Sequence, residues 1–146
     1  MKVLYDNKQI AQTVSRLADE VNKDYAGKKI LLVGVLKGAF VFMADLIRKL
    51  DIPTEIEFIG LSSYEYGQQS KGKVKITKAL ECGVEGRDVL VVEDIIDTGL
   101  TTEYLLDELR QMKPKTLRLC CLLNKPIKRQ VDIKIDYKGL EVPGEF

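Results

Sequence analysis

The stretch from 89 to 102, VLVVEDIIDTGLTT, constrains the fold of this chain more than any other segment. Its opening residues, Val89 to Val92, are all aliphatic, which is typical of a parallel strand covered on both faces. Glu93 and Asp94 follow directly, and two adjacent carboxylates without partners would be costly to bury. Ligands in open α/β sheets bind outside the carboxyl ends of strands. The stretch therefore predicts a strand that ends at a ligand site.

A tight turn and a helix are expected directly after these carboxylates. Thr98, Gly99 and Thr101 lead into a leucine-rich segment with helical spacing. Such a turn offers backbone N–H groups, threonine hydroxyls and a helix N-terminus to an anion, and a phosphate suits it best. Gly99 would let the backbone approach that anion closely. The alternative is an acidic N-capped helix without a ligand, but a cap requires only one such polar residue.

Strands and helices alternate along the rest of the chain, without repeats or interdomain linkers. Apolar runs predict strands over 29–35, 55–61, 73–77, 116–123 and 132–137, and helices between Asn7 and Gly27 and from Ala39 to Leu50. This alternation implies an α/β fold with a mostly parallel, twisted sheet, right-handed crossovers and flanking helices. We expect a single domain over 1–146.

Composition excludes several classes of function. The chain contains no histidine, which rules out Ser-His-Asp and Cys-His catalysis and leaves acid–base chemistry to carboxylates, lysine, tyrosine or cysteine. The net charge of +1 gives no global signal for a nucleic-acid or membrane partner. Apolar stretches are too short to span a membrane, and charges appear too early for a signal peptide. Cys82, Cys120 and Cys121 lack metal-site spacing, which indicates reduced thiols in a cytoplasmic protein, the last two in the core.

Two further segments follow predicted strands and are expected at the same sheet edge. The tripeptide Leu36, Lys37 and Gly38 comes after the strand 29–35, and Lys125 comes after the strand 116–123. Taken alone, neither lysine can be told from an ordinary surface residue. The polar, glycine-containing segment 62–72 has the length of a loop that covers an active site.

The segment Glu93-Asp94-Ile95-Ile96-Asp97-Thr98-Gly99 resembles the diphosphoribosyl-binding signature of the type I phosphoribosyltransferases, and more narrowly their hypoxanthine-guanine (6-oxopurine) branch. The resemblance extends over nearly the whole chain. It implies a role in purine salvage, by transfer of the 5-phosphoribosyl group from 5-phosphoribosyl 1-diphosphate to N9 of hypoxanthine or guanine. The products would be IMP or GMP and pyrophosphate. It also implies a homodimer or homotetramer.

The resemblance assigns the phosphoribosyl group to one continuous set of residues: Glu93, Asp94, Ile95, Ile96, Asp97, Thr98, Gly99, Leu100 and Thr101. Within this set, Glu93 and Asp94 would hold the ribose hydroxyls, directly or through the shell of a Mg²⁺ cofactor. Asp97 would be the catalytic residue, a general base that accepts the proton from N7 as N9 attacks.

The remaining roles implied by the resemblance lie in four short segments. Leu36, Lys37 and Gly38 would form the pyrophosphate loop, with a non-proline cis peptide between Leu36 and Lys37. Ser63 and Tyr64 would fold over the reacting centre. Lys125 would donate to the 6-oxygen of the purine, which favours oxopurines over adenine. Phe146 would stack on the purine.

The chain departs from the family's pattern at several positions. Relatives often have glycine where Glu65 stands, several have lysine in place of Leu100, and most have aspartate in place of Gly144. Relatives also continue for a few dozen residues beyond Phe146, so we expect a domain without the usual C-terminal tail and with a reduced hood over the base. Two alternatives therefore stay open: a regulatory or nucleotide-binding protein of this fold, and a xanthine-specific enzyme.

Overall fold

The computed structural model describes residues 3–63 and 74–144, so the predicted site residues Tyr64 and Phe146 lie outside the described part. The helices are α1 (Asn7–Asp24), α2 (Phe40–Ile47), α3 (Leu100–Gln111) and the short 3-10 turn η2 (Pro126–Lys128). The strands are β1 (Ile30–Leu36), β2 (Thr54–Ser63), β3 (Val74–Lys78), β4 (Asp88–Ile96), β5 (Thr116–Asn124) and β6 (Tyr137–Glu141).

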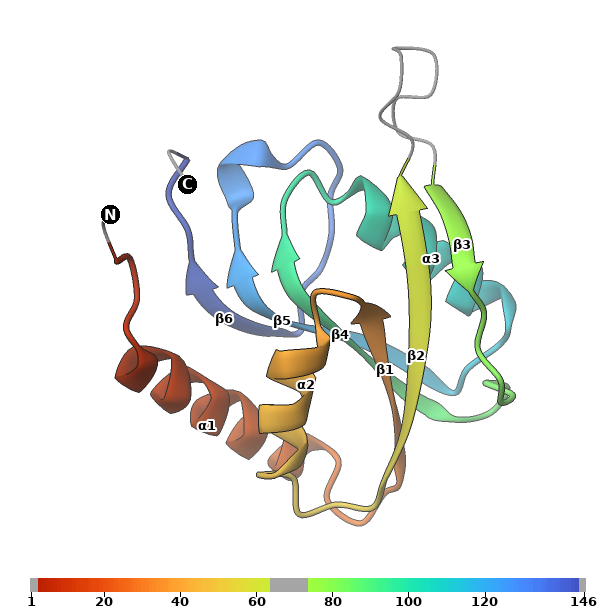
Figure 1. The fold of residues 1–146 in the computed structure, drawn as a ribbon. Helices are drawn as coiled ribbons and strands as arrows, with labels where there is room; N and C mark the ends of the chain where they lie inside the picture. Colours follow the sequence, from red (N-terminus) through yellow and green to blue (C-terminus); the bar gives the residue numbers. More distant parts are fainter. Residues whose placement is uncertain (1–2, 64–73, 145–146) are drawn as a thin grey trace.

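These strands form one six-stranded sheet in the order β3-β2-β1-β4-β5-β6. All neighbouring strands are parallel except β2 and β3, which form an antiparallel pair with a register shift at Gly60 and Leu61. The helices α1 and α2 cover one face of the sheet, and α3 covers the other (Figure 1). The predicted mostly parallel α/β sheet with flanking helices is confirmed.

The sheet is buried on both faces because its central strands carry apolar residues at successive positions. Successive side chains of a strand point to opposite faces. In β1, Ile30 and Leu32 therefore enter the core under α1 and α2, whereas Leu31 and Val33 enter the core under α3. The N-terminal helix α1 starts at a capping box, in which the Asp6 carboxylate accepts from the Gln9 N–H at 2.8 Å.

The prediction of a strand over 132–137 is wrong, because β6 runs from Tyr137 to Glu141 instead. Residues 132–135 pair with no strand of the part that the structure describes. Ile133 and Ile135 pack against the apolar cluster under α3, so their alternation reflects packing of an extended segment rather than sheet pairing. The sheet pairing resumes after Asp136, whose carboxylate accepts from the Leu119 N–H at 2.9 Å.

Smaller differences concern the ends of elements and the cysteines. The loop predicted from Ser62 begins later, since Ser62 and Ser63 still pair with β3. The helix predicted over 39–50 ends at Ile47, and turns continue to Leu50. All three cysteines are free, and Cys120 and Cys121 are buried in the two cores, as predicted. In the described part of the chain, no helix combines the length and apolar character needed to cross a membrane.

Replacing Gly139 in β6 with alanine should destabilise the protein. A Cβ atom there would lie 2.2 Å from the carbonyl oxygen of Leu122, so the backbone of β5 or β6 would have to shift. We expect a loss of roughly 1–3 kcal/mol in the free energy of unfolding. Gly83→Ala is the matched control, because a Cβ atom at that position meets nothing within 4 Å. Urea unfolding of both variants would measure the difference, and equal stabilities would contradict the prediction.

Candidate active site

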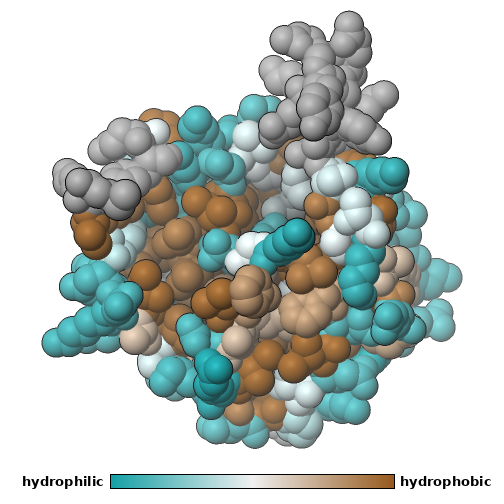
Figure 2. All heavy atoms as spheres, in the orientation of Figure 1, coloured by the Kyte–Doolittle hydropathy of each residue, from teal (hydrophilic) through white to brown (hydrophobic). Residues whose placement is uncertain are grey.

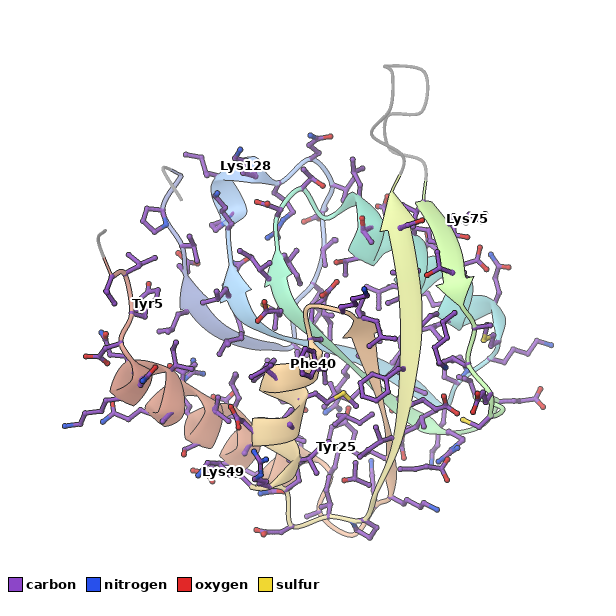
Figure 3. All side chains as sticks on the ribbon, viewed as in Figure 1. Tyr5, Tyr25, Phe40, Lys49, Lys75 and Lys128 are labelled. Carbon is purple, nitrogen blue, oxygen red and sulfur yellow. The ribbon has the colours of Figure 1, made fainter. Side chains whose placement is uncertain are left out.

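The carboxyl ends of β1, β4 and β5 lie side by side at one edge of the sheet, because β4 pairs in parallel with both neighbours (Figure 1). The segments that follow these strands therefore meet at that edge. Lys128, labelled in Figure 3, marks the segment after β5 there. The three predicted site segments of β1, β4 and β5 are thus brought together, as expected from their positions after strands.

A cleft of about 240 Å³ opens at this edge. Its lining combines the ends of β1, β2 and β4 with the first turn of α3, and consists of Val35, Leu36, Gly38, Leu61, Glu93, Ile95, Ile96, Asp97, Thr98, Gly99, Thr101 and Thr102. Most of the residues predicted to bind a phosphoribosyl group thus lie around one hollow. Val35 and Leu61 were not predicted, whereas Thr102 was expected to help bind the 5-phosphate. Asp94, Leu100, Lys37 and Lys125 are not part of the lining.

The two carboxylates at the end of β4 are held in an environment that disfavours their charge. Burial raises the pKa of Glu93 to about 7, against a smaller opposing effect of the Asp94 N–H, which lies 3.3 Å from the Glu93 carboxylate. The Asp94 charge adds to this rise. Burial also raises the pKa of Asp94. A Cβ atom on Gly38 would lie 3.6 Å from the Cβ of Asp94, so Asp94 faces the loop after β1.

Neither carboxylate has a cationic partner within residues 3–63 and 74–144. The same residues contain no cluster of three or more histidine, cysteine or acidic side chains that could by itself enclose a metal ion. Glu93 and Asp94 could therefore hold a metal only together with water or ligand oxygens, which is the usual arrangement for Mg²⁺. Sugar hydroxyls are the other group that would satisfy them.

The turn between β4 and α3 has the conformation that a glycine permits. Gly99 has a φ of +87°, in the left-handed region, and is buried. A Cβ atom there would also approach the side chains of Ile133 and Arg129 to within 2.8 and 2.9 Å. The structure therefore gives Gly99 a second role, since it lets the turn lie against the segment 129–133. The Glu103 N–H then donates to the Gly99 carbonyl at 2.8 Å and starts α3.

The loop after β1 contains the non-proline cis peptide between Leu36 and Lys37 that the resemblance implies. Leu36 and Gly38 line the cleft, and Lys37 is exposed beside it. Lys125 follows β5 and is buried, with 6% of its surface exposed, and its backbone N–H donates to the Ile96 carbonyl at 3.0 Å. Ser63 is the last residue of β2, whose Leu61 lines the cleft.

One residue that holds the site together, Arg129, has no signal in the sequence. Its Nε donates to the Asp97 carbonyl at 3.0 Å, and its Nη2 donates to the Asn124 side-chain oxygen and, at 3.4 Å, to the Ile96 carbonyl. A bond to a backbone carbonyl requires no particular residue type at its acceptor. The role of Arg129 could therefore not be predicted from the sequence, because it depends on the path that the chain takes after Lys125.

Comparison with known proteins agrees with this geometry. A family model described as phosphoribosyl transferase domain matches residues 1–146. The chain belongs to this family. It is 46% identical over 145 residues to the hypoxanthine-guanine phosphoribosyltransferase of Bacillus subtilis, covering 99% of this chain and 81% of that protein. It is also 47% identical to the bifunctional protein TilS/HprT of Listeria monocytogenes serotype 4b, of whose length it spans 22%.

Solved structures share the fold as well as the sequence. The crystal structure of a hypoxanthine-guanine phosphoribosyltransferase from Bacillus anthracis matches with a TM-score of 0.92 and 42% identity, covering all of this chain and 85% of that one. A hypoxanthine phosphoribosyltransferase from Staphylococcus aureus matches with a TM-score of 0.92 and 38% identity over 98% of this chain and 78% of that chain. The six-stranded sheet is therefore the type I phosphoribosyltransferase fold.

Glu93→Gln should stabilise the ligand-free chain at pH 8 and much less at pH 5. The folded chain raises the pKa of Glu93 from its ordinary 4.5 to about 7. The contribution of Glu93 to stability is therefore fully present below pH 4.5 and is lost as the pH rises through 7. Glutamine avoids this loss, and we expect a gain on the order of 2 kcal/mol at pH 8. Urea unfolding would measure it, and a gain independent of pH would contradict it.

Proposed function

We propose that this chain transfers the 5-phosphoribosyl group of 5-phosphoribosyl 1-diphosphate to N9 of hypoxanthine or guanine, forming IMP or GMP and pyrophosphate. One observation carries the proposal. A single cleft is lined by the half-buried Glu93 and by a turn that leads into the N-terminus of α3, in a chain 46% identical to a hypoxanthine-guanine phosphoribosyltransferase. The half-buried Asp94 follows Glu93 directly, and neither carboxylate has a cationic partner among the described residues. Such a cleft suits a ligand with hydroxyls at one end and a phosphate at the other.

The phosphoribosyl group would lie along the strand end and the turn. Backbone N–H groups of Thr98 and Gly99, the Thr101 hydroxyl and the N-terminus of α3 would bind the 5-phosphate. Glu93 and Asp94 would accept hydrogen bonds from the ribose hydroxyls. Their negative charge would also stabilise the positive charge that develops on the sugar as pyrophosphate leaves. The loop Leu36, Lys37 and Gly38 would face the pyrophosphate.

Glu93 and Asp94 would also hold Mg²⁺, directly or through water. They fit this ion because they are oxygen ligands without another cation nearby and cannot enclose the ion alone. Bound with the diphosphate, the ion supplies positive charge to the leaving group. Ionising Glu93 at neutral pH would become more favourable beside any bound cation.

Asp97 would act as the general base. It lies on the cleft wall and is exposed to solvent, and Arg129 binds its backbone carbonyl rather than its carboxylate. It follows the ribose-binding pair by one short turn, where the base would approach the sugar. Lys125 would donate to the purine 6-oxygen. Ser63 and Tyr64 as a cover and Phe146 as a stacking residue remain predictions.

We also propose a cytoplasmic homodimer or homotetramer. Phe40 and Val41 are both 57% exposed and begin α2, one residue after the pyrophosphate loop, which places apolar surface close to the site in the chain. Phe40 is labelled in Figure 3, and hydrophobic side chains gather on the same side of the molecule in Figure 2. Light scattering of the purified chain would give its mass in solution, and a monomer at all concentrations would contradict this assembly.

Turnover with a panel of bases tests the proposed function. The chain would be incubated with 5-phosphoribosyl 1-diphosphate, Mg²⁺ and one of hypoxanthine, guanine, xanthine or adenine. We expect magnesium-dependent formation of IMP or GMP, loss of activity with a chelator, and no product from adenine. Turnover of xanthine alone would assign a xanthine-specific enzyme. Binding of the donor without turnover of any base would favour a regulatory or nucleotide-binding protein.

Asp97→Asn should lower kcat by roughly 10²–10⁴-fold, because the amide cannot accept the proton from N7. The Km for 5-phosphoribosyl 1-diphosphate should change little, since the amide keeps the shape of the loop. Asp107→Asn is the control, because Asp107 is exposed on α3 and, among the described residues, its one ion pair is with Arg110 at 2.8 Å. Steady-state kinetics would decide, and a change in kcat of less than about threefold would remove Asp97 from the catalytic role.

A further inference from the structure

The segment after β5 binds three successive carbonyl groups of the turn between β4 and α3. The Ile96 carbonyl accepts from the Lys125 N–H at 3.0 Å and from Arg129 at 3.4 Å. The Asp97 carbonyl accepts from Arg129 Nε at 3.0 Å. The Thr98 carbonyl accepts from the Gln130 N–H at 2.8 Å. All three carbonyl groups therefore point toward residues 125–130.

This arrangement determines where the N–H groups of the turn point. In a planar trans peptide, the carbonyl of one residue and the N–H of the next point in opposite directions. Leu36–Lys37 is the cis bond of the described chain, so the peptides after Ile96, Asp97 and Thr98 are trans. Their N–H groups, on Asp97, Thr98 and Gly99, must point away from residues 125–130. All three of these residues line the cleft.

These three N–H groups are also free to bind a ligand. None of them donates to an acceptor in the described part of the chain. By contrast, the next N–H, on Leu100, lies 3.2 Å from the Thr98 hydroxyl. The turn thus presents a row of N–H groups to the cleft. Their direction is fixed by the hydrogen bonds that residues 125–130 make to the carbonyl groups on the opposite side of the turn, and Arg129 provides those that come from a side chain.

An arginine suits this position because its guanidinium is planar and carries five donors in a rigid fork. Arg129 uses Nε for Asp97 and Nη2 for Ile96 and for the side chain of Asn124. Its stem lies against Gly99, where an added Cβ atom would approach its Cδ to 2.9 Å. A lysine ammonium is a single point on a flexible stem and could not keep the same set of bonds.

Arg129 also joins the turn to the end of β5. Asn124, which accepts from Arg129, is buried and directly precedes Lys125, the residue expected to meet the purine. No ion pair of Arg129 occurs within residues 3–63 and 74–144. The described hydrogen bonds of its guanidinium therefore all go to oxygen atoms of the turn and of Asn124.

We propose that Arg129 is a positioning residue that aims the N–H groups of Asp97, Thr98 and Gly99 into the cleft and holds the turn against Asn124. This inference rests on the proposed function, in which that turn binds the 5-phosphate. Arg129 would act from behind the turn, through peptide groups, and would not touch the substrate.

The test compares four proteins: the parent chain, Arg129→Gln, Arg129→Lys and the control Lys128→Gln. Lys128 is exposed, and its side chain makes no described contact with the turn, so its loss removes the same charge from the neighbouring position. Two quantities would be measured. NMR would give the chemical shifts and hydrogen exchange of the Asp97, Thr98 and Gly99 amides without ligand. Calorimetry would give the Kd of 5-phosphoribosyl 1-diphosphate with Mg²⁺.

We expect Arg129→Gln to change the chemical shifts and hydrogen exchange of the three amides. It should also raise the Kd of 5-phosphoribosyl 1-diphosphate by roughly 10- to 100-fold, because charge-assisted hydrogen bonds are lost. Arg129→Lys should show the same amide changes and at least roughly a tenfold rise in Kd, because it keeps the charge without the fork. Lys128→Gln should resemble the parent. If Arg129→Gln does not fold, Arg129→Lys decides alone.

Two results would overturn the proposal. One is that the chemical shifts and hydrogen exchange of the three amides stay unchanged in a folded Arg129→Gln or Arg129→Lys variant. The other is a Kd for Arg129→Lys within about threefold of the parent, which would assign Arg129 a role through charge alone. If the parent itself binds no 5-phosphoribosyl 1-diphosphate, the proposed function fails separately. The amide measurement then still decides whether Arg129 orients the turn.

Discussion

The rest of this structure depends on the parallel pairing of β4 with β1 on one side and β5 on the other. Val89 to Val92 are fully buried, so the backbone of β4 must be satisfied by its two neighbours and its side chains by the two cores. Since the three strands run in the same direction, the segments after them arrive at one edge. The same strand pairing therefore buries β4 and assembles the cleft.

The cleft combines two opposite electrostatic environments over a short distance. Glu93 and Asp94 are half-buried acceptors near the end of β4, with raised pKa values, and the following turn presents N–H donors at the start of α3. A sugar phosphate offers hydroxyl donors to the first and phosphate oxygens to the second, which is why the proposed donor fits both ends at once.

Prediction from the sequence succeeded where a pattern is local. The apolar run before Glu93 forms β4, and Gly99 adopts a positive φ in the following turn. The cis peptide at Leu36, which only the family resemblance implied, is also present. It failed where tertiary contacts override a local pattern, since Ile133 and Ile135 alternate like a strand but pack against the cluster under α3. It also missed Arg129, because the carbonyl groups that this side chain binds belong to any residue type.

The sequence by itself determined the order of the elements, the identity of the chemical groups and the family to which they point, because hydrophobic period and motif are properties of short segments. The tertiary structure alone decided which groups meet. Parallel pairing brought residues 36–38, 93–99 and 124–130, far apart in the chain, to one edge. Burial then shifted the pKa of Glu93, and contacts from behind set the direction of the turn's N–H groups, since both effects require neighbours that no single segment contains.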